Sequence, residues 1–516
     1  MNNKEIMLKL LKKHFGYDSF KKGQEKIINT LLSKKDVLCV MPTGGGKSVC
    51  FQIPALMLDG ITVVVSPLIS LMNDQTKSLN SKGISAVSIS GKQEYAALKT
   101  VFKDAAENKY KILYISPEKL ENDNYTSYLL SLDISMIVID EAHCVSQWGQ
   151  SFRPSYLKIR SFISKLSKRP VISAFTATAS VVVRKDIINL LGLTNTYTYI
   201  AGFDRPNIYY SIISPKNKNT ELLSIIKNRF ALCGIVYCST RFMTDKVYDF
   251  LEINNIPVVK YHAGMTDKER TQAQNAFLSG EKTVMTATVA FGMGIDKPDI
   301  SYIVHYNMPL SFENYYQETG RAGRDGEKAE CIMMYNDKDL ETNQKIISNC
   351  ENIKDKSIQK KLVKSSLKKL DKVYRFCHTK KCLRNEMLAF FGEYHISKCG
   401  KCSSCKIRYQ QKNITLSAQK ILSSVARTEQ RAPLSENIYV LKGIKTPYIV
   451  YNKFDTLSTF AIMQDLKVSQ IRILINALIN LGYLRIRQNK HRIILQLTEN
   501  AVPVLKGEKE VFAEFL

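Results

Sequence analysis

A short apolar segment that runs directly into a glycine-rich loop constrains the fold more than any other stretch of this 516-residue chain. The segment, Val37–Val40, is typical of a buried strand, and residues 41–48 follow it as MPTGGGKS. Three consecutive glycines let backbone N–H groups turn toward a bound phosphate, and a helix starting at Lys47 or Ser48 points the positive end of its dipole there. The alternative is a glycine-rich surface turn, because Met41 stands where the strict pattern has its first glycine.

If this loop binds a nucleotide, Lys47 is expected to reach the β and γ phosphates and Ser48 to hold Mg²⁺. The remaining positions of the cradle are Thr43, Gly44, Gly45 and Gly46.

Apolar strands alternate with helical stretches after the loop. The segments Ile61–Val65, Ile112–Ile115 and 136–139 are continuous β-branched runs, which are typical of a parallel sheet buried on both faces. The alternation restarts after residues 203–207, so we predict two α/β units with a cleft between them. Ligands bind at the carboxyl ends of such strands, where the polar motifs of this chain fall.

The tetrapeptide Asp140-Glu141-Ala142-His143 follows the strand at 136–139. Asp140, at a strand end, can hold the water shell of Mg²⁺. Glu141 can orient or deprotonate the water that attacks the γ-phosphate. Residues 144–154 then contain the single tryptophan of the chain beside Phe152 and Arg153. Aromatic rings next to an arginine form a stacking surface for unpaired bases, although an ordinary core tryptophan is the alternative.

The second unit carries two arginines, Arg321 and Arg324, spaced three apart on what we expect to be a helical turn. An arginine brought across the cleft can stabilise charge on the transferring phosphoryl group, and alone the pair would be interpreted as a solvated helix face. The hydroxyls of Thr176 and Thr178 are expected to link the nucleotide site to this second unit.

The charge of the chain favours a polyanionic partner. There are 74 basic and 47 acidic residues, a net charge of +27, and nucleic acid is the usual partner of such a surface. Charge alone leaves a merely basic soluble protein as the alternative. No run has the length of a signal peptide or of a membrane span, so we expect no membrane contact and a cytoplasmic location.

Four of the twelve cysteines are clustered near residue 400. Their spacing, C-x16-C-x2-C-x2-C, supplies four thiolates, which is enough for a closed tetrahedral Zn²⁺ site, and a redox disulfide is the rival interpretation. The predicted ligands are Cys382, Cys399, Cys402 and Cys405.

The last hundred residues contain three helical patterns and then two short strands around a basic turn, a pattern typical of a winged helix. The alternative is a plain hairpin with solvated charges. Contacts to phosphate position a protein on DNA without selecting a base sequence. The candidates for such contacts are Arg485, Arg487, Lys490 and Arg492.

With these motifs assembled, the chain closely resembles the RecQ family of DNA helicases within superfamily 2. The motifs that carry the resemblance occur in order as FKKGQ, MPTGGGKS, DEAHCVSQWG, FTATA, FDRPN, ATVAFGMGID and QETGRAGRDG. The resemblance implies two tandem RecA-like parallel-sheet lobes, a helical zinc-binding domain and a winged-helix domain. We place these four domains at residues 1–205, 206–342, 343–408 and 409–516.

The resemblance also assigns roles to single residues. It implies adenine contacts for Tyr17, Lys21 and Gln24, with Lys21 standing where the family usually has arginine. It implies phosphate and metal roles for the loop and for Asp140, and charges contributed across the cleft by the two arginines. The loop that links DNA binding to hydrolysis is expected to include His143, Gln147, Trp148, Phe152 and Arg153, with Gln150 and Ser151 replacing the common His-Asp.

The function that the resemblance implies is an ATP- and Mg²⁺-dependent 3′ to 5′ helicase that translocates on single-stranded DNA and unwinds duplex DNA in replication, recombination or repair. We expect a monomer that can meet a single-strand-binding protein on its substrate. The alternatives are an RNA-dependent motor and a nucleotide-binding DNA-binding protein without unwinding activity.

Overall fold

The computed structural model of the chain describes residues 2–42, 44–89, 95–146, 152–289, 291, 297–349, 356–394, 398–406, 410–489 and 492–515. No helix among these residues is both long and apolar enough to cross a bilayer.

The first lobe is built on a seven-stranded parallel sheet with the strand order β3-β4-β2-β5-β6-β1-β7. Several strands are buried along their whole length, as the apolar runs predict. The strands are β1 (Val37–Val40), β2 (Ile61–Val65), β3 (Ala86–Ile89), β4 (Ile112–Ile115), β5 (Ile134–Ile139), β6 (Val171–Thr176) and β7 (Tyr197–Ile200). The helices are α1 (Asn3–Phe15), α2 (Gln24–Leu32), α3 (Lys47–Met57), α4 (Ile69–Ser81), α5 (Tyr95–Ala106), α6 (Asp123–Leu130), α7 (Leu157–Lys165) and α8 (Val181–Leu191).

The second lobe repeats this architecture with a six-stranded parallel sheet in the order β10-β11-β9-β12-β13-β8. Gly234 on β9 faces the ring of Tyr302 on β12, and a Cβ there would lie 2.1 Å from that ring. The strands are β8 (Ile208–Ile213), β9 (Cys233–Tyr237), β10 (Val258–Tyr261), β11 (Val284–Ala287), β12 (Ile300–His305) and β13 (Ala329–Met334). The helices are α9 (Lys218–Lys227), α10 (Arg241–Ile253), α11 (Asp267–Leu278), α12 (Phe312–Thr319) and α13 (Asp337–Ser348).

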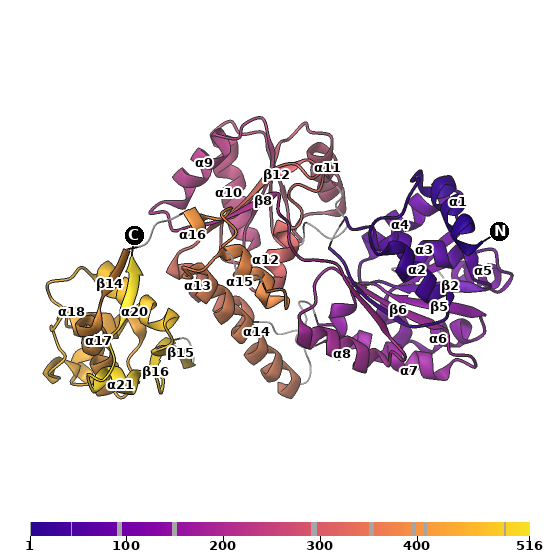
Figure 1. The fold of residues 1–516 in the computed structure, drawn as a ribbon. Coiled ribbons are helices and arrows are strands. Elements are labelled where there is room, and N and C mark those ends of the chain that lie inside the picture. Colours follow the sequence, from indigo (N-terminus) through magenta and orange to yellow (C-terminus); the bar gives the residue numbers. More distant parts are fainter. Residues whose placement is uncertain are drawn as a thin grey trace.

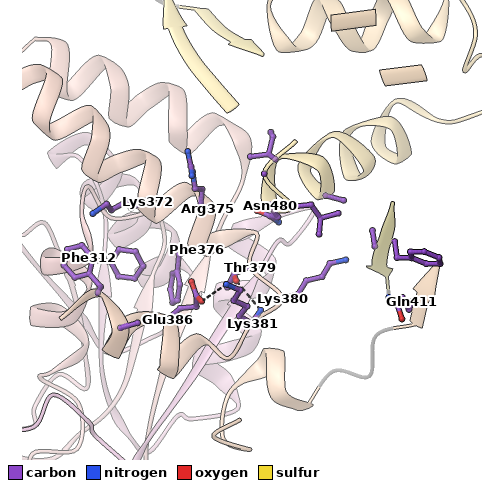
Figure 2. Close-up of a pocket in the computed structure, with 18 residues that line it drawn as sticks. Phe312, Lys372, Arg375, Phe376, Thr379, Lys380, Lys381, Glu386, Gln411 and Asn480 are labelled. Carbon is purple, nitrogen blue, oxygen red and sulfur yellow. Dashed lines mark hydrogen bonds and ion pairs between the residues drawn. The ribbon is translucent and has the colours of Figure 1, made fainter. Parts of the chain in front are cut away.

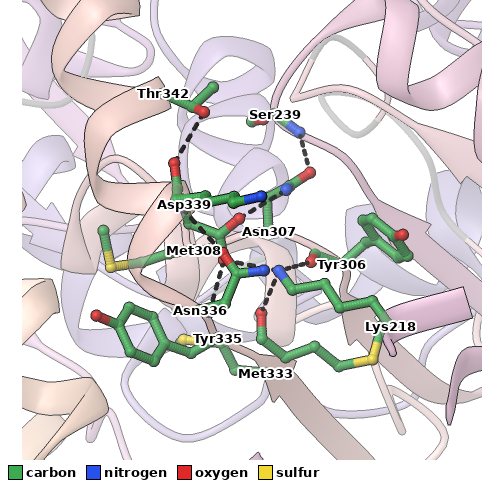
Figure 3. A network of polar contacts seen from close by, with 12 residues as sticks. Lys218, Ser239, Tyr306, Asn307, Met308, Met333, Tyr335, Asn336, Asp339 and Thr342 are labelled. Carbon is green, nitrogen blue, oxygen red and sulfur yellow. Dashed lines mark hydrogen bonds and ion pairs between the residues drawn. The ribbon is translucent and has the colours of Figure 1, made fainter. Parts of the chain in front are cut away.

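A buried ion pair lies at the carboxyl ends of β12 and β13 in the second lobe (Figure 3). The ammonium of Lys218 lies 2.7 Å from Asp339 and also donates to the carbonyl oxygens of Tyr306 and Met334. The other carboxylate oxygen of Asp339 accepts from Asn307 at 2.9 Å. The two charges are therefore paired and hydrogen-bonded, which is the condition under which buried charges are tolerated.

The zinc-binding domain follows as α14 (Lys356–Cys377), α15 (Leu383–Phe390) and α16 (Ser403–Lys406). Its aromatic residues pack on the second lobe, with Phe390 stacked on Phe312 at 4.9 Å between ring centroids. Helix α14 is rich in lysine over its whole length, KSIQKKLVKSSLKKLDKVYRFC.

The winged-helix domain has a hydrophobic core of its own, separate from that of the lobes. It lies on the side of the second lobe away from the first lobe (Figure 1). Helix α20 contacts the neighbouring domains through an ion pair of Arg472 with Asp337 and a hydrogen bond from Asn480 to the carbonyl oxygen of His378. Its elements are β14 (Gln410–Asn413), α17 (Thr415–Arg427), α18 (Leu434–Lys442), α19 (Pro447–Tyr451), α20 (Val468–Asn480), β15 (Leu484–Asn489), β16 (Arg492–Leu497), α21 (Ala501–Leu505) and β17 (Phe512–Phe515).

Candidate nucleotide site between the two lobes

The glycine-rich loop has the backbone that a phosphate cradle requires. Gly44 and Gly46 both adopt left-handed φ values, +78° and +80°, and α3 begins directly at Lys47. Met41, which breaks the strict pattern, is buried and donates its N–H to the carbonyl oxygen of Thr176. The backbone of Met41 is outside the left-handed region, so this position does not need glycine.

A cavity of about 540 Å³ lies beside this loop, and both lobes line it. This volume is in the range of small-molecule and cofactor sites. Most of the residues predicted to act on a nucleotide come together here. From the first lobe these are Tyr17, Lys21, Gln24, Gly44, Gly46, Lys47, Ser48, Asp140 and Glu141, and from the second lobe Arg321 and Arg324.

Two predicted residues of the cradle are not part of this lining. Thr43 lies outside the described residues, and Gly45 belongs to the loop without lining the cavity.

Lys21 and Gln24 connect the segment before α2 to the phosphate loop. The ammonium of Lys21 donates to the carbonyl oxygen of Gly44 at 3.2 Å, and the carboxamide oxygen of Gln24 accepts from the Lys21 N–H at 2.8 Å. Lysine thus contacts the loop backbone where the family usually has arginine.

The two acidic residues after β5 are buried and differ in their titration. Burial raises the pKa of Asp140 to about 6, and the neighbouring Glu141 charge adds to this effect. Burial alone would raise the pKa of Glu141, but His143, Lys47 and Arg321 outweigh it and lower that pKa. A buried carboxyl of raised pKa beside a second carboxylate fits a bound cation, which would stabilise its charged form.

The two arginines of the second lobe reach the cavity, but not from a helix as predicted. Helix α12 ends at Thr319, and both arginines lie in the turns that follow, where Gly323 has a φ of +56°. A Cβ on Gly44 would lie 3.7 Å from Cδ of Arg324, so this side chain extends across the cleft to the phosphate loop. Arg321 is almost fully buried.

A chain of polar contacts joins the carboxylates to the second lobe, as predicted for the two threonines. His143 Nδ1 lies 3.2 Å from Glu141 and 2.9 Å from the hydroxyl of Thr176. The Thr176 hydroxyl donates to the carbonyl oxygen of Thr178, whose own hydroxyl accepts from Gln317 of α12 at 3.3 Å. Sequence reasoning missed Gln317, because nothing in its local pattern shows that it faces the other lobe.

The predicted DNA-coupling loop is described only in part. Gln147, Trp148, Gln150 and Ser151 lie outside the described residues. Phe152 and Arg153 are half-buried, and the guanidinium of Arg153 lies 3.1 Å from Glu118. His143 is buried, so its place suits coupling between the lobes rather than direct contact with DNA.

The four predicted cysteine ligands do come together. The Sγ atoms of Cys382, Cys399, Cys402 and Cys405 all lie within 4.8 Å of one another, and those of Cys399 and Cys405 are 3.9 Å apart. Zn–S bonds of about 2.3 Å in a tetrahedron place sulfurs about 3.8 Å apart, so the cluster fits zinc. A disulfide would need an S–S distance of about 2.05 Å, and all four cysteines are free thiols, so the rival interpretation does not fit.

A second, larger hollow of about 710 Å³ separates the zinc-binding domain from the winged helix (Figure 2). Basic side chains and aromatic rings share its lining with a single acidic residue, Glu386, which pairs with Lys381. The ammonium of Lys372 lies 5.2 Å from the ring centroid of Phe390. The basic residues are Lys372, Arg375, Lys380 and Lys381, and the rings are Phe312, Phe376, Phe390 and Phe512.

The hairpin of the winged helix is formed by β15 and β16, as predicted. Arg485 and Arg487 on β15 are exposed. Lys490 lies outside the described residues, and the side chain of Arg492 is likewise not described.

Four known families match successive segments of the chain. Residues 21–187 match the DEAD/DEAH box helicase family and residues 217–326 the helicase conserved C-terminal domain. Residues 337–406 match the RecQ zinc-binding family, and residues 408–516 the RQC domain.

Individual relatives match almost the whole chain. It is 37% identical over 503 residues to the ATP-dependent DNA helicase RecQ of Bacillus subtilis, covering 97% of this chain and 84% of the relative. The RecQ helicase of Pasteurella multocida is 37% identical over 506 residues, which is 98% of this chain and 79% of the relative. Among solved structures, the helicase MrfA bound to DNA superposes with a TM-score of 0.55 at 20% identity, over 70% of this chain and 54% of that one.

Two RecA-like lobes that share a phosphate-loop cavity, with arginines entering it from the second lobe, define a nucleotide-driven helicase. The zinc-binding and RQC domains narrow this class, and the chain belongs to the RecQ family of ATP-dependent DNA helicases.

Proposed function

We propose that this helicase uses ATP with Mg²⁺ to move 3′ to 5′ along single-stranded DNA while its winged helix engages the duplex ahead. The observation that carries the proposal is the cavity that both lobes line, with Lys47, Asp140 and Glu141 on one side and Arg321 and Arg324 on the other. A site divided between two lobes makes hydrolysis depend on their relative position.

Each side chain of the cavity has a role that its position supports. Lys47 and the N–H groups at the start of α3 bind the phosphates, and Ser48 and Asp140 would hold Mg²⁺, which neutralises phosphate charge when bound. Glu141, whose pKa is lowered, stays ionised and orients the attacking water. Arg321 and Arg324 stabilise the charge that develops on the transferring phosphoryl group, a contribution of roughly 10³–10⁵ in rate for an arginine of this kind.

Coupling to DNA runs through the contacts between the lobes. Gln317 on α12 contacts Thr178, which is connected through Thr176 and His143 to Glu141. A change in the angle between the lobes alters the Thr178–Gln317 contact. Closure of the cleft therefore changes the hydrogen bonding of the Glu141 carboxylate through this series of contacts.

The DNA path that we propose passes the hollow between the zinc-binding domain and the winged helix. Its basic side chains can bind DNA phosphates, and its aromatic rings can stack on unpaired bases. The exposed Arg485 and Arg487 can bind the phosphate backbone of the duplex. Phosphate contacts of this kind set position rather than sequence preference.

We further propose that one chain acts as a monomer, because both sides of the nucleotide cavity come from the same chain. We keep the domain divisions at residues 1–205, 206–342, 343–408 and 409–516. Buried free thiols such as Cys238 and Cys331 suit the reducing conditions of the cytoplasm. The unwound strand is a substrate for a single-strand-binding protein, which we propose as a partner in replication, recombination or repair.

The proposal is tested by measuring the unwinding of two matched duplexes, one with a 3′ single-stranded tail and one with a 5′ tail. This experiment tests the class of enzyme, the DNA substrate and the direction of movement together. We expect strand separation of the 3′-tailed duplex only, with a requirement for both ATP and Mg²⁺. Preferential unwinding of the 5′-tailed duplex would overturn the proposed polarity.

An RNA-dependent motor is the second candidate. A relative from Acanthamoeba polyphaga mimivirus, 38% identical over 402 residues, is named as an ATP-dependent RNA helicase; the match covers 77% of this chain and 71% of that one. Comparing the stimulation of ATP hydrolysis by single-stranded DNA and RNA of the same sequence decides between them. Stronger stimulation by RNA would favour this candidate, and no turnover with either would favour a DNA-binding protein without motor activity.

A further inference from the structure

The guanidinium of Arg205, in the linker between the lobes, binds the backbone of the segment that carries the two cavity arginines. Its two terminal nitrogens donate to the carbonyl oxygens of Gly320 at 3.1 Å, of Ala322 at 2.8 Å and of Gly323 at 2.8 Å. These three carbonyls flank Arg321 on both sides. A guanidinium presents five N–H donors in a planar, rigid fork, so it can hold several carbonyls in a fixed geometry at once.

A second linker residue supports the same segment. Asn207 donates its amide to the carbonyl oxygens of Gly323 and Glu327, at 2.9 and 2.8 Å. The N–H of Gly323 donates to Ile300 at the start of β12. The turn after α12 is therefore held by side chains of the linker and by the start of β12, because it has left the regular hydrogen bonding of a helix.

The linker is in turn fixed by the zinc-binding domain. Arg384, two residues after Cys382, is almost fully buried and donates to Asp204 at 2.7 Å and to the carbonyl oxygen of Ile208 at 2.6 Å. The carboxylate of Glu393 accepts from the N–H of Phe203 at 2.8 Å.

Ring contacts reinforce this attachment. The ring of Phe203 stacks on Phe391 with centroids 4.6 Å apart, and the hydroxyl of Tyr316 on α12 donates to the Phe203 carbonyl oxygen. Contacts on both sides of Arg205 thus hold the linker in place. They fix the backbone position from which the guanidinium of Arg205 extends.

We propose that Arg205 is a positioning residue for hydrolysis, which holds the turn carrying Arg321 and Arg324 so that both arginines face the phosphates when the cleft closes. This inference rests on the proposed role of Arg321 and Arg324. Arg205 itself is absent from the cavity lining, so its effect reaches the chemistry only through the turn. The zinc-binding domain supports the same turn indirectly, because its Arg384 holds the linker that carries Arg205.

A double-mutant cycle on the full chain tests the proposal. Single-stranded-DNA-stimulated ATP hydrolysis is measured for wild type, Arg205→Ala, Arg321→Ala and the double variant. A misplacement of about 1 Å costs about 10²-fold in rate, so we expect kcat of Arg205→Ala to fall by about that factor with KM for ATP unchanged. In the Arg321→Ala background, removing Arg205 should cause much less further loss, because the two residues act as one unit.

Arg160→Ala is the matched control, since Arg160 also donates to a backbone carbonyl, that of Asn189, but far from the cavity. Its kcat should equal that of wild type. Binding of a non-hydrolysable ATP analogue and of single-stranded DNA should be unchanged in Arg205→Ala, which separates positioning from a general loss of structure.

Two results would overturn the inference. One is a wild-type kcat in Arg205→Ala, and the other is a fold-loss of kcat in the double variant that equals the product of the two single fold-losses. If Arg205→Ala proves unstable, Arg205→Lys carries the test. Lysine keeps the charge but not the planar fork, so an intermediate kcat supports the proposal and a wild-type kcat contradicts it. Full activity in Arg321→Ala alone would instead show that the proposed role of that arginine is wrong.

Discussion

The side-chain amide of Gln24 donates a hydrogen bond of 3.0 Å to the carbonyl oxygen of Gly46, joining the start of α2 to the phosphate loop. The carboxamide oxygen of Gln24 is also engaged, by the Lys21 N–H. Each polar end of Gln24 keeps one further hydrogen-bonding position, because a carboxamide carries two N–H donors and two acceptor lone pairs. If Gln24 also contacts adenine, it connects the base directly to the phosphate loop.

We therefore expect Gln24→Ala to raise KM for ATP about tenfold, because one or two hydrogen bonds of about 0.5–1.5 kcal/mol each are lost. The preference for ATP over GTP should fall as well. Steady-state hydrolysis of both nucleotides measures this. Asn29→Ala, an exposed amide on the same helix, is the control and should behave as wild type. An unchanged ATP/GTP preference in Gln24→Ala would show that Gln24 does not recognise the base.

Replacing Lys47 should separate binding of DNA from hydrolysis. Lys47→Ala removes a charge at the start of α3 that lines the cavity between the lobes, and losing one donor to the reacting group costs about 10²–10³ in kcat. We expect DNA-stimulated hydrolysis to be lost while thermal stability and single-stranded DNA binding are retained. Lys268→Ala, on the exposed side of α11, is the control. Substantial DNA-stimulated hydrolysis by Lys47→Ala would contradict the assignment of the phosphate loop.

The raised pKa of Asp140 predicts a pH dependence. Its carboxyl takes up a proton as the pH falls through about 6, so Mg²⁺-dependent binding of ADP should weaken below that pH and reach a plateau above it. Glu141→Gln removes the neighbouring charge that adds to this shift, and its midpoint should therefore move to lower pH. The titration of the nucleotide is the same in both proteins and cancels in the comparison. Identical midpoints would show that a different group controls binding.

The buried ion pair of the second lobe predicts a large loss of stability. Lys218→Met leaves the carboxylate of Asp339 buried without its partner, which costs about 3–5 kcal/mol in the free energy of unfolding. The double variant Lys218→Met/Asp339→Asn should lose less than the single variant, because no uncompensated charge remains. Denaturant midpoints measure both. Lys109→Met, which breaks the exposed pair with Asp104, should leave the midpoint unchanged.

The hollow between the zinc-binding domain and the winged helix gives a prediction for DNA affinity. Lys372→Ala should weaken binding of a tailed duplex and reduce the slope of log K against log salt by about one, as expected for a lost phosphate contact. Lys268→Ala again serves as the control. An unchanged slope would place the DNA elsewhere.

Local sequence signals predicted the first lobe well. The apolar runs located β1, β2 and β4, and Gly-Gly-Gly-Lys-Ser located the start of α3, because strand burial and helix initiation depend on neighbouring residues. The resemblance to a family located the arginines, but their expected helical turn was wrong. Helix α12 ends at Thr319, and Gly323 takes a left-handed conformation that no helix continues.

What the sequence could not show are contacts between distant segments. Arg205 binds carbonyls more than a hundred residues away, and a carbonyl is present at every position, so no residue pattern reveals the pair. Gln317 was missed for the same reason, since its partner Thr178 lies on the other lobe.

The separate hydrophobic core of the winged-helix domain bears on how such enzymes diversify. Since the apolar contacts that hold this domain together are its own, recombination between genes can replace it without disturbing the apparatus that breaks down the nucleotide. Among the described residues, the polar contacts that must be kept are few: Arg472 pairs with Asp337, Asn480 donates to the backbone of His378, and Asn476 accepts from Tyr374. Preference among substrates can thus be inherited separately from the motor.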